Sequence, residues 1–259
     1  MSGHSKWSTI RHKKAINDAK KGKIFSKLST QITHAARQGG ADPQMNPSLR
    51  LYVDKAKSVG FPVDSIERAI AKGVGEGGGL SFEEVVYEGF GPHGVQLLID
   101  TLTDNKNRTV SDLRKLLEEV GGTLSAEGSV SWNFDTKGLV ILKAGRMQEA
   151  EKYGQEDTYI AEDREKVMLD VMDIEGVEDI KEIDIDGVEG LEVYTSYNAL
   201  AKVRDAISDL GYVVEEAEIV KESKTKKRLE GKELEDVKSA LERIEDSDDV
   251  QSVWSDLEE

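Results

Sequence analysis

The chain has 259 residues, of which 37% are hydrophobic and 33% charged, and its formal net charge is −16. This length fits two or three domains that each bury a core, and the composition excludes a fully disordered chain. The absence of cysteine excludes disulfides and cysteine-ligated metal sites, and it favours a reducing compartment.

Targeting signals are not evident in the sequence. Residues 1–7 lack the apolar core of a signal peptide. No stretch approaches the roughly 18 consecutive apolar residues that a membrane span requires. We therefore expect a cytoplasmic protein with no membrane partner.

The charge is distributed unevenly along the chain. Residues 1–72 carry 14 Lys and Arg against 5 Asp and Glu, a net charge of +9. Residues 73–259 carry 21 against 46, a net charge of −25. Charges are screened over about 8 Å at physiological salt, so a distant acidic domain does little to cancel a basic face. The sequence therefore predicts different partners for the two parts.

Three helices are predicted in the basic part, over residues 14–38, 47–59 and 64–72, because a glycine follows each of them. Asn46 and Pro47 suit the N-cap and first position of the second helix. Asp64 and Glu67 have the spacing of a capping box at the start of the third. The segment 73–79 contains five glycines, which predicts a hinge after this all-α domain.

Strands dominate after the hinge. Residues 83–88 and 95–101 are predicted to form a hairpin, followed by a helix over 110–120 capped by Thr109 with Asp112 three residues later. Residues 138–218 follow the order β-α-β-β-α-β, with strands at 139–143, 180–185, 191–195 and 212–217 and helices at 163–173 and 199–210. A strand at 219–230, a helix at 233–244 and a strand at 250–254 would complete the sheet that begins at residue 83.

The predicted fold class is α+β and multidomain. An all-α three-helix domain (1–72) and a Gly-rich hinge (73–79) precede two ferredoxin-like α/β domains. The first is discontinuous (80–137 and 219–259), and the second (138–218) is inserted in it.

Several motifs that suggest small-ligand chemistry have simpler interpretations. The spacing of Gly89, Gly91 and Gly94 matches a dinucleotide fingerprint, but a strand follows where the fingerprint needs a helix, so a hairpin loop is predicted. Residues 182–187 imitate the start of a calcium loop, yet Val193 stands where its bidentate Glu belongs, so we predict a hairpin turn. The acidic stretches 156–165 and 245–249 are interpreted as solvated surface. We expect no catalytic residues, metal site, cofactor or small-molecule substrate.

The N-terminal stretch combines cations with one tryptophan. Lys13, Lys20 and Lys27 are spaced seven residues apart on a helix, next to an apolar stripe of Ile24, Leu28, Ile32 and Ala35. Such a basic face can neutralise phosphates, and an aromatic arm can stack on bases. The alternative is a solvated lysine face with Trp7 closing a core. The candidate nucleic-acid-binding residues are His4, Ser5, Lys6, Trp7, Arg11, Lys13, Lys14, Lys20, Lys21, Lys23 and Lys27.

These residues resemble the YebC family of regulatory proteins. The resemblance includes Gly3-His-Ser-Lys-Trp7, Ala19-Lys20-Lys21-Gly22-Lys23-Ile24-Phe25 and Ala36-Arg37-Gln38-Gly39-Gly40. It continues through Tyr87-Glu-Gly-Phe-Gly-Pro92, Leu102-Thr-Asp-Asn-Lys-Asn-Arg-Thr109 and Gly128-Ser-Val130. The chain departs from the family pattern between residues 145 and 161, where it is longer.

The resemblance implies three domains and a non-catalytic role in gene expression. Members are usually described as DNA-binding transcriptional regulators, and others as translational activators associated with ribosomes. Three functions therefore remain open: a DNA-binding regulator, a translation factor that contacts ribosomal RNA or tRNA on the ribosome, and a protein-interaction module with an incidental basic face.

Overall fold

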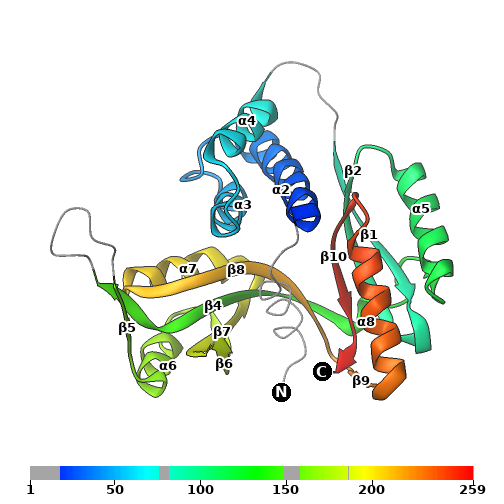
Figure 1. Ribbon diagram of the computed structural model, residues 1–259. Coiled ribbons are helices and arrows are strands. Elements are labelled where there is room, and N and C mark those ends of the chain that lie inside the picture. Colours follow the sequence, from blue (N-terminus) through cyan, green and yellow to red (C-terminus); the bar gives the residue numbers. More distant parts are fainter. Residues whose placement is uncertain (1–17, 76–81, 149–157, 186, 259) are drawn as a thin grey trace. The chain divides into compact units, whose positions relative to one another are not determined.

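The computed structural model describes residues 18–75, 82–148, 158–185 and 187–258 (Figure 1). The fold is mixed α+β, with a helical N-terminal region followed by α/β domains, as predicted. Residues 18–75, 82–135 and 222–258 group into one compact unit, and residues 136–148, 158–185 and 187–221 into a second. The domain limits inferred from the sequence stay a prediction.

Three helices form the N-terminal core: α2 (Asp18–Gly39), α3 (Pro47–Ser58) and α4 (Val63–Val74). Helix α3 begins as predicted, because the Asn46 side chain accepts a hydrogen bond from the Leu49 N–H. Helix α4 begins before Asp64 and has no side-chain hydrogen bond at its N-cap, so the predicted capping box is wrong. The buried residues of this core are Leu28, Ile32, Ala35, Ala36, Leu49, Val53, Ala56, Phe61, Ile66 and Ala69.

Gly73 lies inside α4, whereas the sequence placed it at the end of that helix. A Cβ at this position would lie 2.5 Å from the Thr33 carbonyl oxygen and 2.7 Å from the Ala36 Cβ, both on α2. Gly73 therefore permits close contact between α4 and α2. Residues 73 and 74 are helical rather than part of a hinge, and residues 76–79 lie outside the described residues, so the joint itself stays a prediction.

The first sheet has the strand order β10-β2-β1-β3 and is antiparallel throughout. Its strands are β1 (Glu83–Phe90), β2 (Gln96–Thr103), β3 (Thr123–Ser125) and β10 (Val250–Ser255). Helices α5 (Lys106–Glu119) and α8 (Gly231–Glu245) pack against each other beside it (Figure 1). The C-terminal strand thus joins the sheet that begins at residue 83, as the sequence suggested.

The hairpin between β1 and β2 contains the three-glycine motif. A short 3₁₀ helix, η1 (Pro92–Gly94), forms its loop, and the Gly91 N–H donates to the Val95 carbonyl at 2.8 Å. Gly94 has φ +70°, a conformation that favours glycine. The prediction of a hairpin loop is confirmed.

The second sheet is built from β4 (Phe134–Gln148), β5 (Thr158–Ala161), β6 (Val177–Ile185), β7 (Val188–Ser196) and β8 (Tyr212–Ser223). Strands β5-β4-β7-β6 are neighbours in that order, and β8 pairs with β4. Helices α6 (Arg164–Met172) and α7 (Leu200–Asp209) both contact β7, and the short η3 (Tyr197–Ala199) precedes α7. Apart from β5, this is the predicted β-α-β-β-α-β order. Strands β6 and β7 pair antiparallel on either side of the predicted turn, of which residue 186 lies outside the described residues.

Two parts of the chain differ from the predicted elements. Strand β5 falls within the segment 145–161 that departs from the family pattern, and it pairs antiparallel with the end of β4. The strand predicted over 219–230 is not continuous, because β8 ends at Ser223 and β9 (Lys227–Arg228) pairs instead with β11 (Leu257–Glu258). The chain therefore leaves the second sheet at the end of β8 and, before α8, contributes β9 to a separate two-stranded sheet.

A buried carboxylate organises the loop that follows β3. Glu88 of β1 is 5% exposed, and it accepts hydrogen bonds from the N–H groups of Gly128, Val130 and Ser131 at 2.8, 2.6 and 3.0 Å. Burial alone would raise the pKa of Glu88, but these donors hold it below its usual value. The loop conformation before η2 (Ser131–Asn133) therefore depends on the charged form of Glu88.

We expect Glu88→Gln to lower the free energy of unfolding by about 1–3 kcal/mol at neutral pH, because an amide presents one acceptor to three donors. The lowered pKa means that the contribution of Glu88 is present above about pH 4.3 and is lost as the pH falls through the folded value. Urea unfolding at several pH values tests this. The difference in the free energy of unfolding between wild type and Glu88→Gln should become smaller in acid. The exposed control Glu118→Gln should show no comparable loss of stability at neutral pH.

Two glycine-to-alanine substitutions test the packing of α4 on α2. In an open helix position this change stabilises by up to about 1 kcal/mol, and a Cβ added at Gly22 of α2 would have no neighbouring atom within 4 Å. Gly73→Ala should instead destabilise by about 1–3 kcal/mol, because the added methyl group overlaps α2. The midpoint temperature of thermal unfolding should therefore rise for Gly22→Ala and fall for Gly73→Ala. A rise for both would show that the helices are not closely packed at Gly73.

Candidate nucleic-acid interface

Helix α2 carries the part of the predicted basic face that the structure describes. Leu28, Ile32 and Ala35 are buried in the helical core, and Ile24 packs against it, so the predicted apolar stripe is confirmed. Lys21 and Lys23 are exposed, and Lys27 is half-buried. The helix therefore separates a core-facing stripe from a set of accessible ammonium groups.

Most of the other predicted contacts fall outside the described residues. This is the case for His4, Ser5, Lys6, Trp7, Arg11, Lys13 and Lys14. Lys20 lies within α2, where the structure describes only its backbone. The structure thus places the side chains of Lys21, Lys23 and Lys27, and the assignment of all eleven residues to nucleic-acid binding stays a prediction.

Lys23 and Lys27 contact the end of helix α8. The Lys23 Nζ donates to the Asp246 carbonyl at 3.2 Å and lies 3.5 Å from the Asp246 carboxylate. The Lys27 Nζ donates to the Glu245 carbonyl. A helix C-terminus carries a partial negative charge, so it attracts ammonium groups even without its acidic side chains. Sequence reasoning assigned these two lysines to phosphates and did not foresee the internal contact.

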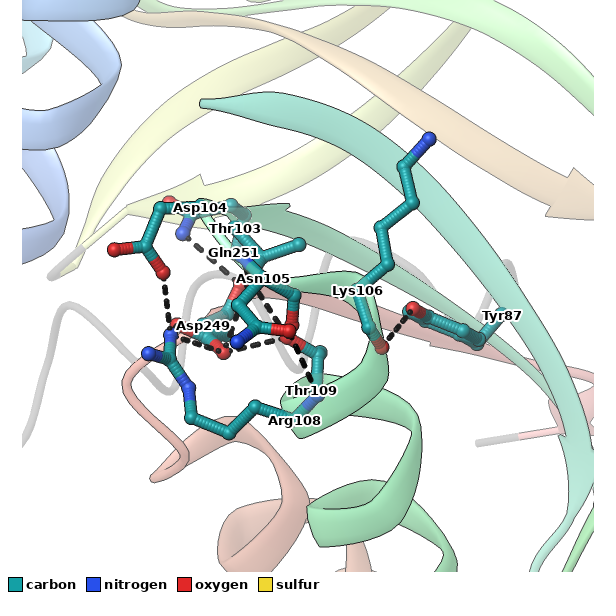
Figure 2. Close-up of polar contacts among 9 residues, drawn as sticks. All are labelled: Tyr87, Thr103, Asp104, Asn105, Lys106, Arg108, Thr109, Asp249 and Gln251. Carbon is teal, nitrogen blue, oxygen red and sulfur yellow. Dashed lines mark hydrogen bonds and ion pairs between the residues drawn. The ribbon is translucent and has the colours of Figure 1, made fainter. Parts of the chain in front are cut away.

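A second polar cluster joins the end of β2 to the start of α5, within the family motif of residues 102–109 (Figure 2). The Asn105 side chain caps α5 by accepting from the Arg108 N–H at 3.1 Å. Thr109 lies inside the helix and is not its cap, contrary to the sequence prediction. Its hydroxyl is instead 2.7 Å from an Asp249 carboxylate oxygen.

Asp249 is the acceptor that holds this cluster together. Its Oδ2 accepts from Thr109 and also lies 3.4 Å from the Thr103 hydroxyl, while Arg108 donates to both of its oxygens at 3.2 Å (Figure 2). Arg108 also pairs with Asp104 at 2.8 Å. Asp249 was expected to be solvated surface, but its side chain is only 20% exposed.

This cluster is a structural clamp. The Arg108 guanidinium donates to the carboxylates of Asp104 and Asp249, and the Asn105 N–H donates to the Thr103 hydroxyl, so these groups satisfy one another. The clamp ties the first turn of α5 and the end of β2 to the segment that leads into β10. Asn105 three residues before Arg108 was the sequence signal for the cap, whereas nothing local in the sequence pointed to Asp249.

The described residues were also compared with the arrangements that hold metal ions and with the helices that cross membranes. Within residues 18–75, 82–148, 158–185 and 187–258, no group of three or more His, Asp or Glu residues is arranged to hold a metal ion. Among the helices of these same segments, none combines the length and the apolar character that crossing a membrane requires.

Comparison with known proteins identifies relatives along the whole chain. The family described as "TACO1/YebC protein N-terminal domain" matches residues 5–76, and "TACO1/YebC second and third domain" matches residues 82–257. A probable transcriptional regulatory protein of Geobacter sulfurreducens is 44% identical over 258 residues, which cover 100% of this chain and 96% of the relative. A probable transcriptional regulatory protein of Caldanaerobacter subterraneus subsp. tengcongensis is 39% identical, and the match covers 100% of this chain and 98% of the relative.

A solved structure supports the same relationship. The crystal structure of a conserved hypothetical protein from Aquifex aeolicus matches with a TM-score of 0.77 and 35% identity. The match covers 93% of this chain and 91% of that one. The resemblance found in the sequence is therefore confirmed, and the chain belongs to the TACO1/YebC family.

Proposed function

We propose that this protein is a non-catalytic regulator of gene expression that binds nucleic acid through the basic face of its N-terminal region. Helix α2 carries the proposal, because its apolar stripe is buried while Lys21, Lys23 and Lys27 keep access to solvent. The net charge of +9 over residues 1–72 extends this basic character to the arm that precedes α2. The names of the relatives supply the regulatory role.

Lys23 and Lys27 already have partners on α8, so a nucleic acid has to compete with these contacts. An exposed ion pair such as Lys23–Asp246 is worth about 0–1 kcal/mol, since water and salt already screen both charges. Phosphates can replace it, because neutralising them also releases condensed counterions. Salt should consequently weaken binding steeply.

The nature of the nucleic acid separates two versions of this function. A DNA-binding transcriptional regulator agrees with the names of the relatives. A ribosome-associated factor that contacts ribosomal RNA or tRNA is favoured by the one tryptophan, Trp7, among the cations of the arm, because unpaired RNA bases stack on aromatic side chains. The cytoplasmic location stays a prediction. The protein-interaction module is the outcome if neither ligand binds.

A double substitution, Lys20→Glu and Lys27→Glu, should weaken binding to duplex DNA and to structured RNA. Each lost phosphate contact should reduce the salt slope of log K by about 0.9 on duplex and about 0.7 on single strands. Fluorescence anisotropy at several salt concentrations measures both quantities.

The control is Lys57→Glu with Lys72→Glu, which changes the net charge equally at exposed positions of α3 and α4. This control should bind nearly as wild type does. If both double variants lose affinity equally, total charge rather than the α2 face determines binding, and unchanged binding by the α2 variant would refute the proposal.

Trp7→Ala distinguishes the two ligands. Loss of a stacking residue costs about 1–3 kcal/mol with little change in salt slope. We expect this loss on RNA with single-stranded loops but not on duplex DNA, whose bases are already stacked on one another. Parallel titrations at one salt concentration test this, with Trp7→Phe as the matched variant that retains an aromatic ring. Equal losses on both ligands would indicate that Trp7 only supports the fold.

A further inference from the structure

Trp132 is an exposed tryptophan in an ordered loop of the first α/β domain. It lies in η2, and 60% of its surface is accessible. Its indole N–H donates to the Ser129 carbonyl at 3.0 Å, so the polar atom of the ring is already satisfied. The exposed part of the side chain is therefore apolar aromatic surface. Such a large exposed aromatic surface is unusual.

Hydrogen bonds on both sides of Trp132 fix its position. Before it, the Glu88 carboxylate holds the N–H groups of Val130 and Ser131. After it, the Asn133 side chain accepts from the Thr225 N–H at 2.9 Å and donates to the Thr225 carbonyl at 3.1 Å. A ring held in this way loses little conformational freedom when it binds a ligand.

The segment next to Trp132 is the most basic part of the acidic region. Residues 222–228 contain one Glu and four cations, whereas residues 73–259 as a whole have a net charge of −25. The cations of this segment are Lys224, Lys226, Lys227 and Arg228.

Hydrogen bonds bring this segment beside the tryptophan. The Lys224 N–H donates to the Asn133 carbonyl at 2.7 Å, and its ammonium group lies 3.2 Å from the Trp132 carbonyl oxygen. Lys224 also forms an ion pair with Asp135 at 3.0 Å, but both side chains are about half exposed, so this pair is weak. Lys224 thus lies beside the aromatic ring, while the Lys227 ammonium group donates to the His93 carbonyl and Arg228 pairs with Glu230 at 2.9 Å further along the segment.

We propose that Trp132 and the basic segment 222–228 form a second contact site, which binds an unpaired base and the adjacent phosphates of a single-stranded nucleic acid. Stacking uses the exposed ring, and the cations attract the backbone, which is the combination found in sequence-tolerant single-strand binding. A protein partner is less suited, because a lone ring bordered by cations offers little apolar area. The site assumes the nucleic-acid ligand of the proposed function, but none of its residues belongs to the N-terminal region.

Intrinsic fluorescence provides a direct test in the full-length protein. The chain has three tryptophans, so Trp7→Phe with Trp254→Phe leaves Trp132 as the reporter. Stacking should quench its fluorescence on titration with oligouridylate or oligodeoxythymidylate, and a duplex of matched length should quench it far less. The two single strands distinguish RNA from DNA as the source of the base.

Affinity measurements on other variants keep the test valid if the single-tryptophan variant fails to fold. Trp132→Ala in the otherwise unchanged protein should weaken single-strand binding by roughly 5- to 150-fold, as expected for one lost stacking contact. Lys224→Glu with Lys226→Glu should also weaken it, whereas Arg114→Glu with Lys115→Glu, an equal charge change at exposed positions of α5, should not.

The two proposals can fail separately. If Lys20→Glu with Lys27→Glu binds like wild type while Trp132 is still quenched, the α2 face is refuted and the second site stands. The second site is refuted if single strands do not quench the fluorescence of Trp132 and Trp132→Ala binds them as tightly as wild type. This conclusion holds whatever the result for the α2 variant. Equal quenching by duplex and single strands, or capture of a protein that Trp132→Ala abolishes without any effect on nucleic acid, would also overturn it.

Discussion

The pairing of β10 with β2 is the constraint on which the larger compact unit depends. Leu97, Leu98 and Ile99 of β2 are all buried, so this strand must lie in the interior of a sheet. Its backbone groups then need a partner on each side, because an unpaired buried N–H or C=O is costly. Strand β1 fills one side, and the other side remains open until the last residues of the chain arrive.

Hydrogen bonds to two carboxylates, one at each end of β2, stabilise the pairing of β10 with β2. Asp249 accepts from Thr109 and Arg108 at one end, and Asp256 accepts from the Gln96 N–H at 2.9 Å at the other. Burial raises the pKa of Asp256, because a carboxylate removed from water loses hydration. The chain leaves this unit after Asp135 and re-enters it at Glu222, and just inside these limits the Lys224 N–H donates to the Asn133 carbonyl. Because the two ends of the intervening segment meet, that segment leaves the first sheet intact.

The sequence predicted the elements of the fold better than the contacts between distant residues. Hydrophobic periodicity and glycine positions located the helices, both sheets and the apolar stripe of α2, since these signals are local. Gly73 was misinterpreted because a helix-packing glycine and a helix-ending glycine look alike until the neighbouring helix is known. Asp249 was missed because its partners lie about 140 residues earlier. For the same reason the basic segment 222–228 could not be connected to Trp132, because Lys224 and Trp132 are 92 residues apart.

Acidic groups beside each basic surface influence which ligand can bind there. Repulsion between exposed charges fades over about 8 Å at physiological salt, so only nearby acids matter, such as Asp246 beside Lys23 and Asp135 beside Lys224. These acids reduce the attraction for phosphates, and a ligand that offers phosphate charge alone gains little. A ligand that also presents an unpaired base gains stacking energy, which carboxylates do not oppose. In the function proposed here, the mixture of charges would act against uniform duplexes more than against exposed single strands, so that selectivity would arise from weakened attraction as well as from contact.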